Sequence, residues 1–218
     1  MIYLLQDHIN DPHDRIYPIK KRGSDGIMTA QKENVQRKTL VIIAHPELHK
    51  GSRVNQKLAQ AAAQHTTTVH DLYAAYGNTA IHVEREQQLL LDHDRIIFQF
   101  PVWWYSCPSL LKQWFDDVLT YGWAYGEGGN KLHGKEWGLA VTAGGSDFAY
   151  TPQGYNHFPL EQLLRPFEVT ASIIGTTFLP VFSVYNAMQL SEEELELKAE
   201  EYAIHLTSAM NPLCTSAV

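Results

Sequence analysis

The chain has 218 residues, of which 44% are hydrophobic and 19% are charged, a composition typical of globular proteins rather than disordered or fibrous chains. Its formal net charge of −7 argues against a nucleic-acid partner, because phosphate contacts need a clustered basic surface. Two cysteines are too few for a disulfide framework, and no apolar run reaches the length of a membrane span. The N-terminus also lacks the order of a signal peptide, so we expect a cytoplasmic protein.

The first 38 residues show no sustained hydrophobic period and contain two prolines and two glycines. We interpret residues 1–38 as an N-terminal extension and residues 39–218 as the folded domain. In this domain, short apolar or β-branched runs alternate with stretches of helical character. The runs expected to be strands are residues 39–44, 66–72, 94–100, 135–143 and 175–185. The stretches expected to be helices are residues 53–64, 83–93, 109–120, 159–174 and 191–209.

Most of these strands are apolar throughout, which is typical of a parallel sheet covered by helices on both faces. Pro166 is expected to kink or break the fourth helix, because proline removes a backbone hydrogen bond. The alternation predicts an α/β fold, a three-layer doubly wound sheet of five parallel strands in the flavodoxin-like order 2-1-3-4-5. In such a sheet, ligands bind beyond the carboxyl ends of the strands, near the point where the strand order reverses.

The loop after the first strand, residues 45–58 (HPELHKGSRVNQKL), enters a helix through Ser52. Free backbone N–H groups and the helix dipole make such a point an anion site. Ser52, Arg53 and Asn55 add a hydroxyl, a cation and an amide. Because the loop lacks the glycine patterns of dinucleotide and P-loop sites, the sequence favours a single phosphate. The alternative is that Ser52 only caps the helix.

The loop after the third strand, residues 101–108 (PVWWYSCP), carries three consecutive aromatic residues, Trp103, Trp104 and Tyr105. Aromatic side chains at the end of a strand are expected to be exposed, and an exposed aromatic cluster usually covers a surface. We interpret it as a stacking wall for a flat conjugated ligand. The alternative is a roof over the core or a dimer interface, where tryptophan and tyrosine are enriched.

The loop after the fourth strand, residues 142–158 (TAGGSDFAYTPQGYNHF), begins with two adjacent glycines. Glycines there allow a ligand to approach the backbone closely, although they would also serve an ordinary turn. Taken together, the three loops offer a phosphate site, an aromatic wall and an edge of backbone amides. These are the three features that a flavin requires.

Four segments carry a resemblance to a known family: AHPELHKGSRVN, PVWWYSCPSLLKQWFDDVLTYGWAYG, KLHGK and VTAGGSDFAYTPQG. They resemble the flavodoxin-like NAD(P)H:quinone oxidoreductases, above all the smaller bacterial members that include ancillary subunits of glutathione-gated potassium efflux systems. The resemblance covers residues 39–190. It implies a flavin-containing homodimeric enzyme that passes a hydride from NADPH or NADH to the flavin and then to a quinone, in a ping-pong mechanism. The short core favours FMN, with FAD as the alternative.

The resemblance also implies roles for individual residues. Those that would hold the flavin are His45, Ser52, Arg53, Val54, Asn55, Pro101, Val102, Trp103, Trp104, Tyr105, Thr142, Ala143, Gly144 and Gly145. Tyr150 matches a tyrosine that accommodates the negative charge of the reduced flavin. The family's matching histidine falls on Asn156, with His157 one position away. The glycine-rich tract 122–129 (GWAYGEGG) would contribute to the partner subunit's pocket.

The sequence also bears on other classes of site and function. His45 and His49 are four residues apart, but Pro46 prevents the shared helical face that a metal-binding pair needs, so we expect no metal. Cys107, beside Pro108, is expected to be structural rather than nucleophilic. A different class of function is a flavin-binding regulatory subunit that docks on a membrane transporter and so lies at the membrane, with the basic segment KKRG as a docking arm. A nitro- or azo-reductase would use the same site.

Overall fold

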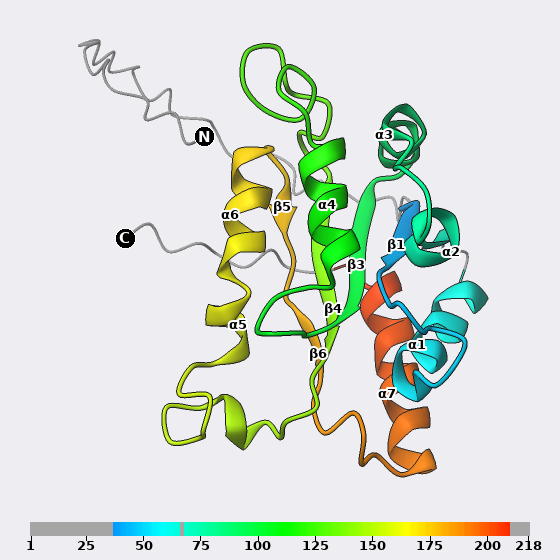
Figure 1. The fold of residues 1–218 in the computed structure, drawn as a ribbon, viewed down its shortest axis with the longest axis vertical. Coiled ribbons are helices and arrows are strands. Elements are labelled where there is room, and N and C mark those ends of the chain that lie inside the picture. The colour runs from blue at the N-terminus through cyan, green and yellow to red at the C-terminus, as the bar shows by residue number, and fades with distance from the viewer. Residues whose placement is uncertain (1–36, 66–67, 210–218) are drawn as a thin grey trace, which may run out of the picture. The chain divides into compact units, whose positions relative to one another are not determined.

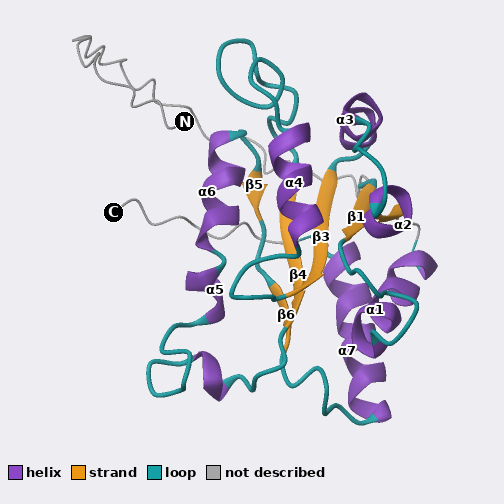
Figure 2. Cartoon of the chain, in the orientation of Figure 1, coloured by secondary structure: helices purple, strands orange, loops and turns teal. Residues whose placement is uncertain are grey.

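The structure is a computed structural model that describes residues 37–65 and 68–209; most of the predicted extension, residues 1–36, lies outside this description. Its strands and helices are, in chain order, β1 (Thr39–Ile43), α1 (Arg53–Gln64), β2 (Thr68–Asp71), α2 (Leu72–Tyr76), α3 (Val83–Leu91), β3 (Arg95–Pro101), α4 (Ser109–Val118), β4 (Glu136–Thr142), a 3-10 turn (Phe148–Tyr150), α5 (Leu160–Leu163), α6 (Arg165–Ile173), β5 (Thr177–Phe178), β6 (Phe182–Val184) and α7 (Glu192–Thr207). Figures 1 and 2 show their arrangement.

The paired strands are parallel and follow the order β2-β1-β3-β4-β5, with β6 also beside β4. The predicted fold class is therefore confirmed. The expected fifth strand, residues 175–185, is instead two short strands. Pro180 lies between them, and a proline has no N–H to donate to a sheet ladder. Residues 159–174 likewise form two helices, α5 and α6, which confirms the predicted break near Pro166.

The apolar strands bury both faces of the sheet. On β1, Leu40 and Ile42 belong to a core cluster that includes residues of α2 to α6, whereas Val41 and Ile43 belong to a second cluster with α1 and α7. All four side chains are 0% exposed. This period of two follows from the pleat of a strand, and it explains why the helices form one layer on each side of the sheet (Figure 1).

The end of α7 is fixed to the sheet by a buried arginine. Arg95 is 2% exposed, and its Nε donates to Oε2 of Glu136 at 2.6 Å. Its Nη1 and Nη2 donate to the carbonyl oxygens of Leu206 and Ser208 at 2.7 and 2.9 Å. Because the last carbonyls of a helix have no intrahelical partner, Arg95 acts as a C-terminal cap supplied by the sheet.

His205, on α7, makes the stability of this helix layer sensitive to acid. Its ring stacks with Tyr202 and contacts Phe182. Burial, together with the positive charge of Arg95, lowers the pKa of His205 to about 4, from 6.5 when unfolded. The unfolded chain therefore binds more protons between these values, so stability is lost as the pH falls from 6.5 through about 4.

We expect His205→Phe to reduce the dependence of the free energy of unfolding on pH between 6.5 and about 4, measured by urea unfolding at a series of pH values. His49→Phe changes a largely exposed side chain and should leave this pH dependence unchanged. Equal curves for the two variants would contradict the assignment.

Candidate functional site

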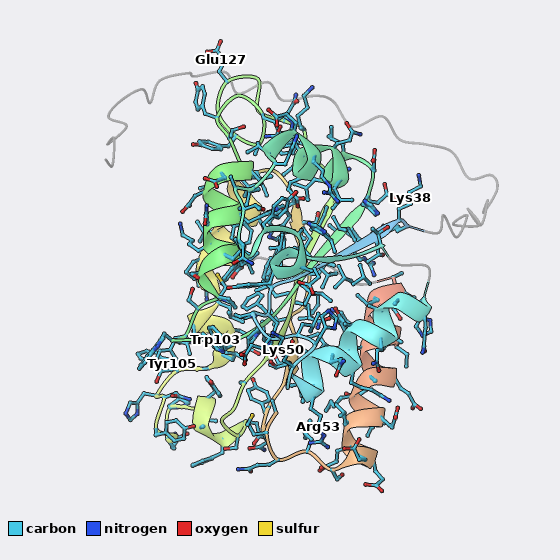
Figure 3. All side chains as sticks on the ribbon, turned by 45° about the vertical axis from the view of Figure 1, so that its right-hand side comes forward. Lys38, Lys50, Arg53, Trp103, Tyr105 and Glu127 are labelled. Atoms are coloured by element: carbon cyan, nitrogen blue, oxygen red, sulfur yellow. The ribbon has the colours of Figure 1, made fainter. Side chains whose placement is uncertain are left out.

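A cavity of about 540 Å³ opens at the carboxyl ends of β1, β3 and β4, at the edge that the strand order predicts. Its lining residues are His45, Glu47, Gly51, Ser52, Arg53, Val54, Asn55, Pro101, Val102, Trp103, Thr142, Gly144, Ala187 and Met188. Figure 3 shows Lys50, Arg53 and Trp103 at this end of the molecule, with Glu127 at the other. The volume falls within the range of small-molecule sites, about 300–1,000 Å³.

The N-terminus of α1 forms one end of the cavity. Val54 and Asn55 lie in the first turn, where helix N–H groups have no intrahelical acceptor. Ser52 occupies the N-cap position, but its side chain makes no capping hydrogen bond. The alternative in which Ser52 only caps the helix is therefore not what the structure shows, and the hydroxyl is available to a ligand. The helix dipole favours an anion at this point.

Arg53 lines the same end but is already engaged with the start of α7. Its Nε donates to Oε1 of Glu192 at 2.9 Å and its Nη2 donates to the carbonyl oxygen of Leu190 at 2.6 Å. The guanidinium charge is thus partly neutralised by Glu192. Backbone amides of α1 must then supply much of the attraction for an anion, with Arg53 holding the neighbouring segment in place.

His45 follows β1 directly, and its contacts fix its protonation. Its Nδ1 accepts a hydrogen bond from the backbone N–H of Glu47 at 3.1 Å. Burial lowers the pKa of His45, although Glu47 and Asp71 oppose this effect. The ring is therefore neutral near pH 7, with its proton on Nε2, where it is a donor. Its ring also meets Trp103 edge to face, with centroids 6.4 Å apart.

The aromatic loop is a tight two-residue turn. Trp103 and Ser106 exchange two backbone hydrogen bonds, of 3.1 and 3.0 Å, and the residues between them, Trp104 and Tyr105, have φ of 48° and 62°. Positive φ at both central positions is the geometry for which Asn-Gly is preferred, and each bulky residue there costs about 1–3 kcal/mol. Such strain is typical of functional segments.

The structure brings only part of this aromatic loop to the cavity. Pro101, Val102 and Trp103 line it. Trp104 and Tyr105 do not, and their exposed fractions are 94% and 48%. These two side chains form exposed aromatic surface beside the cavity rather than part of its wall.

The glycine loop after β4 supplies the opposite side. Thr142 and Gly144 line the cavity, whereas Ala143 is buried and donates its N–H to the carbonyl oxygen of Val184 at 2.8 Å. A Cβ added to Gly145 would meet the Tyr155 hydroxyl at 2.5 Å, but one added to Gly144 would meet nothing within 4 Å. Gly144 does not have a left-handed φ either. Neither the backbone nor a neighbouring group of the chain requires a glycine at position 144, so the open space beside it fits a ligand that approaches the backbone closely.

None of the three proposed catalytic residues lines the cavity. Tyr150 is half-buried with its ring centroid 5.7 Å from that of Tyr185, and burial raises the pKa of Tyr150. His157 is exposed and has a φ of 63°. Asn156, however, accepts a hydrogen bond at Oδ1 from the Tyr105 hydroxyl at 3.1 Å. This bond ties the aromatic loop to the glycine loop, a link made by Asn156 and not by His157.

Cys107, within the aromatic loop, does not have the character of a nucleophile. Burial raises the pKa of its thiol, so the reactive thiolate is disfavoured. This supports the structural interpretation of Cys107.

Sequence reasoning missed the segment after β6, where Ala187 and Met188 line the cavity. Asn186 donates its N–H to the carbonyl oxygen of Gly145, and Ala187 donates to that of Ala143, both at 3.0 Å. The segment thus lies along the glycine loop. No motif in its sequence signals this contact, because it depends on where β6 places the chain.

Residues 37–65 and 68–209 contain neither a metal-binding cluster nor a membrane-spanning helix. No three His, Cys, Asp or Glu side chains are grouped so that they would hold a metal ion. None of the helices described combines the length and the apolar character needed to cross a bilayer.

The chain is similar to known proteins over most of its length. Residues 37–206 match the model of a family described as having the flavodoxin-like fold. An uncharacterized NAD(P)H oxidoreductase of Bacillus subtilis, YdeQ, is 49% identical over 177 residues, which cover 80% of this chain and 89% of the relative. The ancillary protein KefG of a glutathione-regulated potassium-efflux system of Cronobacter sakazakii is 44% identical over 176 residues, 80% of this chain and 95% of KefG.

Two solved structures agree with this assignment. General stress protein 14 of Treponema denticola, determined in complex with FMN, superposes with a TM-score of 0.73 at 41% identity, covering 78% of this chain and 97% of the other. An NADPH-quinone reductase from P. pentosaceus gives a TM-score of 0.71 at 36% identity, covering 79% and 99%. The architecture, the site at the switch point of the sheet and these similarities together lead to one conclusion: the chain belongs to the flavodoxin-like family of NAD(P)H oxidoreductases.

Proposed function

We propose that this protein is an FMN-dependent NAD(P)H:quinone oxidoreductase. The observation that carries the proposal is the cavity at the carboxyl ends of β1, β3 and β4, with a helix N-terminus at one end and Gly144 open toward it. The FMN complex of a relative that is 41% identical supports the choice of FMN. The reaction would run in two steps, from NADPH or NADH to the flavin and then from the flavin to a quinone, with FAD as the alternative cofactor.

The residues of this chain would bind and orient the cofactor. Amides of the first turn of α1, with the Ser52 hydroxyl and Arg53, would hold the phosphate. Trp103 would flank the ring system, and Thr142 and Gly144 would lie along its pyrimidine edge. The flavin supplies the hydride chemistry. Donors fixed at the ring edge, such as His45 Nε2 or backbone amides, stabilise negative charge that develops there.

Tyr105, Asn156 and Tyr150 would act on the open side of the site. The Tyr105–Asn156 hydrogen bond joins two loops at its rim, which would set the width of the opening through which a flat acceptor enters. Tyr150 is protonated at neutral pH, since an ordinary tyrosine has a pKa of about 10 and burial raises the pKa of Tyr150 further, so it would serve as a donor toward the reduced ring. Hydride transfer needs the donor and the flavin face to face, and a narrow opening would impose that arrangement.

The proposed assembly is a homodimer. The loop between α4 and β4 extends from the end of the molecule opposite the cavity (Figures 1 and 3), so its exposed Tyr121 and Tyr125 cannot reach the cavity of their own protomer. A groove of about 450 Å³ between α4 and α6 carries exposed apolar side chains, among them Ile173. A second copy covering this groove would bring the Tyr121–Tyr125 segment toward its partner's site.

A second candidate is a flavin-binding regulatory subunit of a potassium-efflux transporter, for which the similarity to KefG is the specific support. Such a protein would be cytoplasmic and would reach the inner face of the membrane through its partner. The basic KKRG segment proposed as a docking arm lies outside the described residues. A nitro- or azo-reductase would use the same cavity and differ only in its acceptor.

The proposal is tested by the absorbance spectrum of the purified protein, followed by anaerobic addition of NADPH and then menadione. We expect flavin bands in the near-ultraviolet and blue that bleach with NADPH and return with the quinone. A colourless protein that fails to take up added FMN or FAD would contradict the proposal that this chain is a flavin-dependent enzyme. Bleaching without reoxidation by menadione, together with co-purification of a transporter, would favour the regulatory subunit.

A further inference from the structure

A chain of three polar side chains lies beneath the cavity, starting from Gln99 in the middle of the sheet. Gln99 is 0% exposed and pairs with Ile43 on β1 and Ala140 on β4. A polar side chain buried at the centre of a parallel sheet is costly unless its hydrogen bonds are made. Packing alone therefore does not explain why a glutamine occupies this position.

The orientation of the Gln99 amide is fixed by a backbone carbonyl. Its Nε2 lies 2.9 Å from the carbonyl oxygen of Asn55, and only an N–H can be the group that faces an acceptor. The Gln99 Oε1 is then left without a partner among the described residues. An unpaired buried acceptor destabilises the fold, and such costs are retained mainly at functional sites.

Gln99 in turn orients the side chain of Asn55, which is 3% exposed. The same Nε2 lies 3.5 Å from Asn55 Oδ1, whereas Asn55 Nδ2 lies 2.9 Å from Thr142 Oγ1. Turning the Asn55 amide over would bring its N–H groups against those of Gln99, donor against donor. The direction of the contact between Asn55 and Thr142 is therefore set: Asn55 donates and Thr142 accepts.

The consequence falls on the Thr142 hydroxyl. Because its oxygen accepts from Asn55, its own proton must be directed to another acceptor, and Thr142 lines the cavity. We propose that Gln99 is a positioning residue, which acts through Asn55 to hold the Thr142 hydroxyl as a hydrogen-bond donor to an acceptor atom of the bound flavin. This inference rests on the proposed function. It gives the buried glutamine a role without any contact between Gln99 and the ligand.

The test is a double-mutant cycle on FMN binding, with dissociation constants from quenching of FMN fluorescence. Gln99→Met and Thr142→Val are each expected to raise the dissociation constant about three- to tenfold, the worth of one hydrogen bond. In the Thr142→Val background, Gln99→Met should have no further effect, because the hydroxyl it positions is gone. Thr142→Ser keeps the hydroxyl and should restore both the affinity and the dependence on Gln99.

Ile97→Val is the matched control, because Ile97 lies two residues earlier on β3 and contributes to the core under α1 and α7. It should lower thermal stability without changing FMN affinity. The positioning role of Gln99 would be contradicted if Gln99→Met and Thr142→Val had additive effects on FMN affinity. It would also be contradicted if Ile97→Val lowered FMN affinity as much as Gln99→Met does. Neither result would contradict the proposed enzymatic function. A wild-type protein that does not quench FMN fluorescence would overturn both.

Discussion

Gly144→Val is expected to weaken FMN binding roughly 10- to 100-fold, the effect of overfilling a packed site by about 1–3 kcal/mol. The physical reason is that a side chain at this position would extend into space that no group of the protein occupies. Because the backbone of Gly144 does not have a left-handed φ, the apoprotein should accept the substitution. Fluorescence quenching gives the affinity, and thermal unfolding of the apoprotein gives the stability.

The size of the added group provides a graded control. Gly144→Ala adds one methyl group and should give a smaller loss of affinity than Gly144→Val, with apoprotein stability close to wild type in both. If both variants instead unfold at lower temperature and bind FMN normally, Gly144 serves the fold and does not mark the ligand.

Glu86→Leu is expected to lower the free energy of unfolding by about 3–5 kcal/mol, the usual cost of removing one member of a buried charged cluster. Glu86 is 0% exposed. Its carboxylate accepts from the Tyr76 hydroxyl at 2.7 Å and from Trp114 Nε1 at 2.9 Å. His70 Nε2 lies 3.1 Å from Oε1 but is not directed at it as a regular hydrogen bond is. Leucine would leave these donors buried without an acceptor.

The contribution of Glu86 to the free energy of unfolding is also expected to depend on pH in the acid range. Burial alone would raise the pKa of Glu86, but the nearby His70 and the hydrogen bonds from Trp114 and Tyr76 outweigh it, so the pKa lies below the ordinary value of 4.5. A folded pKa below the unfolded one stabilises the fold above 4.5, and this contribution is lost as the pH falls through the folded value. The difference between wild type and Glu86→Leu should therefore narrow below pH 4.5.

Urea unfolding at a series of pH values measures both effects. Glu84→Leu is the matched control, since its side chain is 85% exposed on the same helix, and it should change stability by no more than about 0.5 kcal/mol. Similar losses in the two variants would show that the helix, and not the buried cluster, accounts for the effect.

The sheet was predictable because its strands are short runs of apolar residues with few polar interruptions. The second strand ends one residue earlier than predicted, at Asp71, for a local reason. Residues 66–72 were expected to be extended, but Asp71 accepts from the backbone N–H groups of Tyr73 and Ala74 at 3.0 Å and caps α2. Aspartate is a good cap wherever it follows a strand, and the alternating pattern conceals this.

The site was predictable as a set of loops but not as a set of side chains. The switch point of the sheet placed the three loops at the cavity, where Ser52, Trp103 and Gly144 are found. The exposure of Trp104 depends on a strained turn. The burial of Glu86 depends on hydrogen bonds from α2 and α4 and on the nearby His70 of β2. Glu86 belongs to a stretch expected to form an amphipathic helix, in which a carboxylate is normally solvated. Such positions are decided by tertiary contacts that local sequence does not encode.

The cap that Arg95 provides for α7 also bears on how the domain folds. Arg95 is buried against Glu136, and its remaining donors bond to the carbonyl groups of Leu206 and Ser208, 111 and 113 residues further along the chain. Until α7 docks, the sheet face beneath it is exposed and the guanidinium keeps only part of its hydrogen bonds. Contacts between residues so far apart in sequence are slow to form, because a long loop must close before they are made. Docking of α7 is therefore expected to be a late step of folding, in which the helix and the sheet become ordered together.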